Sequence, residues 1–216
     1  MARTQSGWVL AGALAVSLVP AAAAAEHRFP VVFHLATEEG QSVVGEEKLQ
    51  RLVETANAKF RGAELGFEVD EKRQLPDGNA VLETISDRRS LARFLRPRVI
   101  NVFVVREILD EVPSEATIRA AGWQGFRPTG RLSGAHIPTA QPPGTYILLT
   151  ARASATSLAH ELGHFFGAGH HRDPENIMSY GAGRSRFSDR QLRAFRMFAR
   201  RYARSGRLRP VPNGQS

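Results

Sequence analysis

The chain has 216 residues, no cysteine and a formal net charge of +8, with a pI near 10.9. The absence of cysteine excludes disulfide bonds, so stability has to come from packing and from any bound metal. A basic chain attracts polyanions, but the sequence contains no basic motif interleaved with aromatic residues and no recognition module. We therefore predict no specific nucleic-acid partner.

Residues 1–25 have the pattern of a secretory signal peptide. Arg3 precedes an apolar run from Trp8 to Val19, and Pro20 and five alanines follow this run. The apolar run is too short to predict a membrane span. We predict cleavage after Ala25, secretion or export to the periplasm, and a mature chain of about 190 residues that forms one domain.

The chain from residue 29 to residue 150 alternates strand patterns with helical patterns. Apolar runs predict strands over residues 29–35, 65–69, 99–105 and 146–150, and helical periodicity predicts helices over residues 46–60 and 90–94. Strands that alternate with helices indicate a twisted, mainly parallel sheet with helices packed on it. The predicted fold class is therefore α/β (α+β).

The run from His160 to His170 has the spacing of a catalytic zinc site. On a helix, His160 and His164 lie one turn apart on the same face, so both imidazoles can bind one ion. Glu161 is rotated by about 100° from them and can reach a water on that ion without binding the metal itself. Gly167 can supply the left-handed residue that ends the helix, so that His170 returns as the third ligand. Three protein ligands and an open fourth position are typical of a catalytic Zn²⁺.

The other face of the same helix is apolar, which predicts that it packs on the core. Its N-cap is predicted at Ser154 or Thr156. The apolar positions follow the i, i+4, i+7, i+8 pattern of a buried helix and are Leu158, Leu162, Phe165 and Phe166.

A last helix is predicted from Ser188, as its cap, to about Ala203. Its apolar stripe consists of Leu192, Phe195, Phe198 and Ala199, and arginines occupy most of its other positions. We interpret these arginines as a solvated face, or alternatively as a patch that adheres to an anionic surface. The tail, residues 207–216, is predicted to be disordered, and the protein is expected to be a monomer.

The run Asn176-Ile177-Met178-Ser179-Tyr180 follows the three histidines. With the motif residues His160, Glu161, His164, Gly167 and His170, the sequence resembles the metzincin clan of zinc endopeptidases, which carry a methionine turn beneath the metal. The resemblance implies that Met178 forms an apolar floor under the imidazoles. It also implies that Tyr180 binds zinc or hydrogen-bonds the tetrahedral intermediate, whereas the alternative for Tyr180 is a packed turn aromatic.

The sequence combines features of several metzincin subfamilies. His171 matches none of the residues usual after the third ligand, and the spacing from His170 to Met178 is similar to that of matrixins. The turn itself is similar to that of astacins and serralysins, and there is also likeness to the pappalysin and cytophagalysin group. The resemblance therefore names no single subfamily.

The resemblance also implies how the domain, residues 26–206, is organised. An upper subdomain of residues 26–167 would hold the sheet, a backing helix and the active-site helix, and a lower one of residues 168–206 would hold the methionine turn and the last helix. The Gly- and Pro-rich segment 122–144 would form an antiparallel edge strand, with Gly134, Ala135 and His136 at the substrate rim. The alternative is a plain surface loop, with His136 a rim residue, a second metal ligand or neither.

The predicted function is a secreted zinc-dependent endopeptidase that acts on a peptide or protein substrate. Glu161 would act as the general base toward a zinc-bound water. Two alternatives are a zinc hydrolase of a non-peptide amide and a catalytically weak relative that binds zinc and docks peptides.

Overall fold

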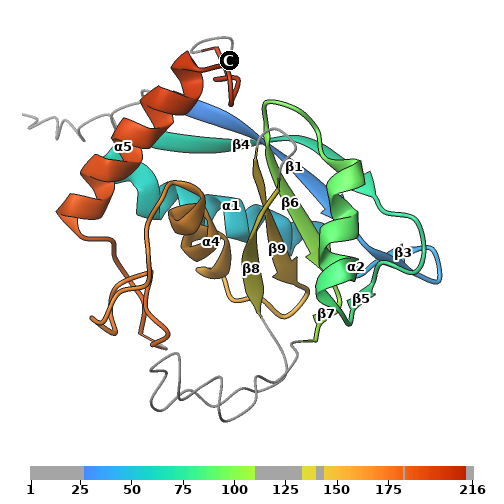
Figure 1. The fold of residues 1–216 in the computed structure, drawn as a ribbon. Coiled ribbons are helices and arrows are strands. Elements are labelled where there is room, and N and C mark those ends of the chain that lie inside the picture. The colour runs from blue at the N-terminus through green and yellow to red at the C-terminus, as the bar shows by residue number, and fades with distance from the viewer. Residues whose placement is uncertain (1–26, 110–132, 140–143, 182, 213–216) are drawn as a thin grey trace, which may run out of the picture.

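The structure is a computed structural model that describes residues 27–109, 133–139, 144–181 and 183–212. A sheet of five strands forms its centre, in the order β4-β1-β6-β9-β8 (Figure 1). The strands are β1 (His27–Leu35), β4 (Leu65–Gln74), β6 (Ile100–Val105), β8 (Gly134–Pro138) and β9 (Thr145–Thr150). All neighbours are parallel except β8, which pairs antiparallel to β9 at the edge of the sheet. The predicted fold class is confirmed.

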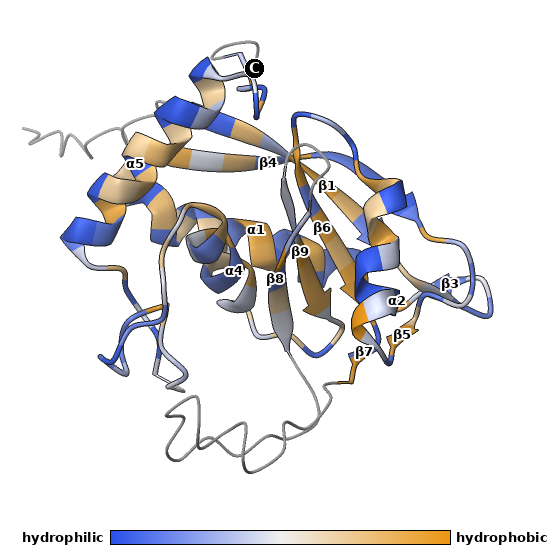
Figure 2. Ribbon diagram, viewed as in Figure 1, coloured by the Kyte–Doolittle hydropathy of each residue, from blue (hydrophilic) through white to orange (hydrophobic). Residues whose placement is uncertain are grey.

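The sheet is buried on both faces because its central strands are apolar on both sides. Every residue of β6 and β9 is buried, and Figure 2 shows hydrophobic residues along both strands. Alternate residues enter two separate cores: Val102 and Val104 face one core, and Phe103 and Val105 face the other. A continuous apolar run is the expected sequence of a strand that is covered on both faces.

Helices cover each face of the sheet (Figure 1). On one face α1 (Glu46–Phe60) and α4 (Ser157–Phe165) pack together and on the sheet. On the other face lie α2 (Ile85–Ser90) and the short helix η2 (Leu91–Phe94). The bounds of α1 agree with the prediction, because its apolar residues form one stripe that is buried along its length.

The remaining short elements connect these layers. The strands β2 (Thr37–Glu38) and β3 (Gln41–Ser42) form an antiparallel pair. The strands β5 (Val81–Leu82) and β7 (Glu107–Ile108) form a parallel pair, and η1 (Arg61–Ala63) continues α1. No helix in the described part of the chain is long and apolar enough to cross a membrane.

The last helix, α5 (Asp189–Arg204), begins at a capping box. The hydroxyl of Ser188 accepts a hydrogen bond from the backbone N–H of Gln191, as the sequence predicted. The buried residues of α5 are Phe195, Ala199 and Tyr202. Its outer side is hydrophilic in Figure 2, and contact between this side and an anionic surface stays a prediction.

Residues 207–212 differ from the disorder predicted for the tail. Leu208 is fully buried, and its N–H donates to the carbonyl of Tyr202. The backbone of Arg209 donates to Arg98, and the backbone of Val211 donates to Arg28. Proline and arginine dominate this segment, so its one buried leucine gave no periodic pattern to recognise. The signal peptide prediction falls outside the described residues, and so do 122–132 and 140–143 of the segment predicted as a rim.

Candidate metal centre and active site

Helix α4 carries the first two histidines of the motif and lies beside β8 and β9 (Figure 1). His160 is buried, and the apolar residues on the opposite side of the helix are buried as predicted. Thr156 occupies the N-cap position but makes no capping hydrogen bond through its side chain. The hydroxyl of Ser154 lies 2.9 Å from that of Ser157 instead.

The chain reverses directly after α4. Gly167 has φ of +86°, which confirms the left-handed residue predicted there. Its N–H donates to the carbonyl of His164, and the N–H of Ala168 donates to Gly163. A Cβ on Gly167 would also lie 2.8 Å from the ring of Phe198, so both conformation and space favour glycine. This turn brings His170 back over the helix.

The three predicted ligands converge. His160, His164 and His170 form a group in which one ring nitrogen of each lies within 4.8 Å of the others. The Nε2 atoms of His164 and His170 are 3.2 Å apart. Two nitrogens that each lie about 2.0–2.1 Å from a tetrahedral zinc would be about 3.4 Å apart, so this separation fits zinc.

The opposite nitrogen of each imidazole is already engaged. Nδ1 of His160 lies 2.7 Å from the carbonyl of Ile177, and Nδ1 of His164 lies 2.8 Å from the carbonyl of Ala168. A carbonyl can only accept, so both Nδ1 atoms carry the proton and both Nε2 atoms keep a free lone pair. Nδ1 of His170 lies 3.0 Å from the hydroxyl of Tyr180. Such contacts orient metal-binding imidazoles.

Burial keeps these imidazoles neutral. It lowers the pKa of His160 to about 4 and lowers the pKa values of His164 and His170 as well. A neutral imidazole is the form that binds a metal, so the residues present fit a Zn²⁺ cofactor. No other group of three metal-ligating side chains occurs in the part of the chain that the structure describes.

Glu161 lies beside this group and is buried. Burial raises the pKa of its carboxyl to about 8, and the charge of Arg184 acts in the opposite direction. A bound dication would act in the same direction as Arg184 and favour the carboxylate. A Cβ on Gly134 would lie 2.9 Å from Oε1 of Glu161, so glycine in β8 leaves room for this side chain.

Strand β8 brings the predicted rim residues to the site, but their side chains do different things. His136 lies opposite Ile147 of β9, and its Nε2 is 2.5 Å from the hydroxyl of Thr145. The His136 ring is 6.2 Å from that of His164, and His136 is not part of the metal-binding group. Ala135 packs against the core on the other face of the sheet, so its side chain points away from the histidines. The predicted antiparallel edge strand is present.

The methionine turn packs under α4. Met178 is fully buried, and its Sδ occupies the place where a side chain on Gly163 would begin. The side chain of Asn176 shapes the turn, since its Oδ1 accepts from the N–H of Met178. The carbonyl of Met178 accepts from the N–H of His171, which ties the turn to the segment of the third ligand.

Tyr180 follows this turn and is 76% exposed. Its hydroxyl contacts His170, and the two ring centroids are 4.4 Å apart. Burial and the charge of Glu161 raise the pKa of the Tyr180 hydroxyl. Tyr180 is therefore protonated at neutral pH and able to donate a hydrogen bond beside the metal-binding group.

Sequence reasoning missed Gly163 and Arg184, and it named Gly134 only as a substrate-rim residue and not as a neighbour of Glu161. Gly163 and Gly134 leave room for Met178 and Glu161, but a glycine shows no such role before its neighbours are known. Arg184 reaches His160 from the loop before α5, and Nη1 lies 3.2 Å from Nδ1. Nothing in the sequence distinguishes Arg184 from the other arginines.

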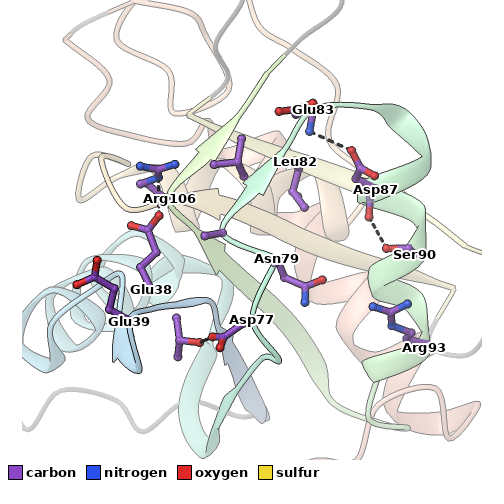
Figure 3. A pocket seen from close by; sticks show the side chains of 14 residues that line it. Glu38, Glu39, Asp77, Asn79, Leu82, Glu83, Asp87, Ser90, Arg93 and Arg106 are labelled. Atoms are coloured by element: carbon purple, nitrogen blue, oxygen red, sulfur yellow. Dashed lines mark hydrogen bonds and ion pairs between the residues drawn. The ribbon is translucent and has the colours of Figure 1, made fainter.

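A hollow of about 1070 Å³ lies away from the histidine group, beside β2, β5 and α2 (Figure 3). Most of its charged lining has partners within the protein: Arg106 pairs with Glu38 at 3.0 Å, and Asp77 accepts from Thr37. Asp87 caps α2. These groups serve the local structure, so we assign no ligand to this hollow.

The sequence matches no protein-family model and no curated protein. The structure, however, resembles solved metalloproteinase structures. Mature mirolysin from Tannerella forsythia, in complex with a cleaved peptide, shares 12% identity at a TM-score of 0.57, covering 83% of this chain and 97% of that one. Archaemetzincin from Methanopyrus kandleri shares 16% identity at a TM-score of 0.50, covering 80% and 96%.

Metalloproteinase-II from Bacteroides fragilis shares 13% identity at a TM-score of 0.53 over 81% of this chain. The chain spans 53% of the length of that protein. The chain has a metzincin-like zincin fold. The likeness at these identities concerns the fold, which places the histidine group between α4 and the methionine turn.

Proposed function

We propose that this zincin is a zinc-dependent endopeptidase with Glu161 as the general base. One observation carries the proposal: three neutral imidazoles direct free nitrogens to one point beside a buried carboxylate. Zinc bound there would have an open position for water. The metalloproteinase folds that resemble this chain support the same function.

Zinc, Glu161 and Tyr180 would each supply one part of the chemistry. When bound, zinc lowers the pKa of a coordinated water and polarises the peptide carbonyl. Glu161 accepts a proton from the attacking water and passes it to the leaving amine. The hydroxyl of Tyr180 donates to the carbonyl oxygen as that oxygen gains negative charge.

The edge strand supports a peptide as the substrate. β8 pairs only with β9 in the described part of the chain, so its other edge can bind an extended peptide through backbone hydrogen bonds. Gly134, at the start of this strand, lies next to Glu161. A peptide added there would run past the catalytic base.

Digestion of a protein substrate by the purified protein tests this proposal. We expect peptides to form, a chelator to stop the reaction and added zinc to restore it. Hydrolysis of small non-peptide amides without any peptide cleavage would favour the first alternative function. Zinc-dependent peptide binding without hydrolysis would favour a docking relative, although an intact Glu161 argues against this alternative.

We also propose that the enzyme acts after export from the cytoplasm. The charged start, apolar run and alanines of residues 1–25 support this location. Expression of the full chain in a bacterium, followed by mass spectrometry of the exported protein, tests it. The expected N-terminus is Glu26, and full-length protein confined to the cytoplasm would contradict the proposal.

A further inference from the structure

Arg184 places a positive charge behind a metal-binding imidazole. It lies in the loop between the methionine turn and α5, and its side chain is half-buried. Nη1 lies 3.2 Å from Nδ1 of His160 and 3.4 Å from the carbonyl of Ser179. One imidazole ring separates the guanidinium from the nitrogen that faces the metal position.

The guanidinium of Arg184 has few hydrogen-bond partners among the described residues. Nδ1 of His160 donates to Ile177 and carries a proton, so it offers no lone pair to Arg184. The long contact to Ser179 is the remaining polar contact that the described residues supply. A guanidinium has five N–H donors, so most donors of Arg184 have no acceptor among the described residues.

The neighbouring Arg186 shows how a guanidinium in this loop can be paired with carboxylates. Arg186 pairs with Asp173, at 3.4 Å, and with Glu175. Arg184 has no carboxylate within ion-pair distance among the described residues, and Glu161 acts on it only as a nearby charge. The two arginines therefore differ in their partners.

A half-buried guanidinium next to a dication site gains from an anion that binds it directly, and Glu161 acts on Arg184 only as a nearby charge. Arg184 contacts His160, and the group that approaches His160 during the proposed reaction is the substrate. A carboxylate matches a guanidinium best, because two parallel N–H donors can bind its two oxygens. A substrate carboxylate would also be attracted by the charge of the metal.

We propose that Arg184 binds a carboxylate of the peptide substrate close to the cleaved bond, so that the enzyme prefers acidic peptides. The inference rests on the proposed peptidase function. The carboxylate belongs either to an Asp or Glu side chain near the cleaved bond or to the C-terminus of a short peptide. Both sources present the same group to Arg184.

Kinetics on matched peptides test the inference. A peptide library first locates the cleaved bond. Peptides are then compared in pairs that differ only in Glu or Gln at one position next to this bond, or only in a free or amidated C-terminus. In at least one of these pairs, we expect kcat/KM to be about tenfold or more higher for the peptide with the carboxylate than for its neutral partner. Arg184→Gln should remove this preference, and Arg184→Glu should reverse it toward a Lys peptide. Arg186→Gln is the matched control and should keep it.

A binding measurement separates this inference from the proposed function. The same peptides, fluorescently labelled, are titrated into zinc-loaded Glu161→Gln protein with Arg184 or Gln at position 184. We expect the carboxylate peptide to bind about tenfold more tightly only when Arg184 is present. Discrimination in binding without any hydrolysis by the wild type would reject the peptidase function and keep the carboxylate site. Equal affinity for both peptides, with zinc content and folding unchanged, would overturn the inference.

Discussion

The sulfur of Met178 occupies the space next to Gly163 that any other residue would need for its side chain. Gly163 lies on α4 between the two histidines of the helix, so this contact sets how closely the methionine turn approaches the metal-binding face. A helix interior otherwise favours alanine over glycine by about 1 kcal/mol. Packing here outweighs helix propensity.

Gly163→Ala should therefore destabilise the protein although it adds a good helix former. We expect a loss of about 1–3 kcal/mol, because overpacking displaces Met178 and with it the turn that positions His160. Thermal unfolding and zinc content measure the effect. The double variant Gly163→Ala, Met178→Ala removes the steric conflict and should regain zinc binding. A Gly163→Ala protein more stable than wild type would contradict this packing.

Glu161→Gln should keep zinc bound and abolish hydrolysis. No metal ligand is lost, but an amide cannot accept the proton of the attacking water. Zinc content and the rate of peptide cleavage are measured on the same preparation. Activity within tenfold of the wild type would exclude Glu161 as the base.

His170→Ala should release zinc, whereas His171→Ala should retain it. Nε2 of His170 faces Nε2 of His164, while His171 is exposed and its Nδ1 accepts from the N–H of Asp173. Loss of zinc should also lower thermal stability, because the metal links α4 to the segment after it. The reverse pattern, with zinc lost only in the His171 variant, would show that the third ligand is misassigned.

The fold was largely predictable because hydrophobic patterns report burial directly. α1 begins and ends where its stripe does, whereas β4 was predicted to end at residue 69 and continues to Gln74. The second half of β4 alternates partly buried and exposed polar residues, so it carries little hydrophobic signal. Pairing with β1 supports this half of the strand, and a single sequence does not show that pairing.

The convergence of the three candidate ligands was predictable because their spacing along one helix and one turn is local. The groups around them come from distant residues: the carbonyl of Ile177 accepts from Nδ1 of His160, and the guanidinium of Arg184 lies beside the same ring. Any residue has a carbonyl, and the chain has many arginines. Only the fold shows which of them lie at the site.

Acid should destabilise the zinc-free protein. Burial lowers the pKa of His34, and burial lowers the pKa of His136 to about 4. In the unfolded chain these imidazoles have the ordinary pKa near 6.5, so the unfolded state binds more protons between about pH 6.5 and pH 4. The free energy of unfolding should therefore fall as the pH falls through this range. Each unit of lowered pKa corresponds to about 1.4 kcal/mol at most.

Urea unfolding of chelator-treated protein at pH 7.5, 6 and 5 measures this dependence. His34→Phe should reduce the acid effect, since phenylalanine can stack on Phe103 as His34 does and takes up no proton. Asn101 keeps a partner in this variant, because its Oδ1 also accepts from the N–H of Arg96. An unchanged pH dependence in His34→Phe would mean that His34 is not among the groups responsible.

Tyr180→Phe distinguishes two roles that the structure permits for one hydroxyl. If the hydroxyl stabilises charge on the carbonyl oxygen, turnover should fall by roughly tenfold to a thousandfold, with KM and zinc content nearly unchanged. If it only orients His170, which it contacts at 3.0 Å, zinc affinity should fall and excess zinc should restore turnover. We expect the first result, because the side chain is largely exposed and free to move toward a substrate. Met178→Leu is the contrasting variant: it changes apolar support alone and should cost less than about 1.5 kcal/mol of stability while hydrolysis continues. A fully active Tyr180→Phe enzyme with normal zinc affinity would exclude both roles and leave His160, Glu161, His164 and His170 as the site.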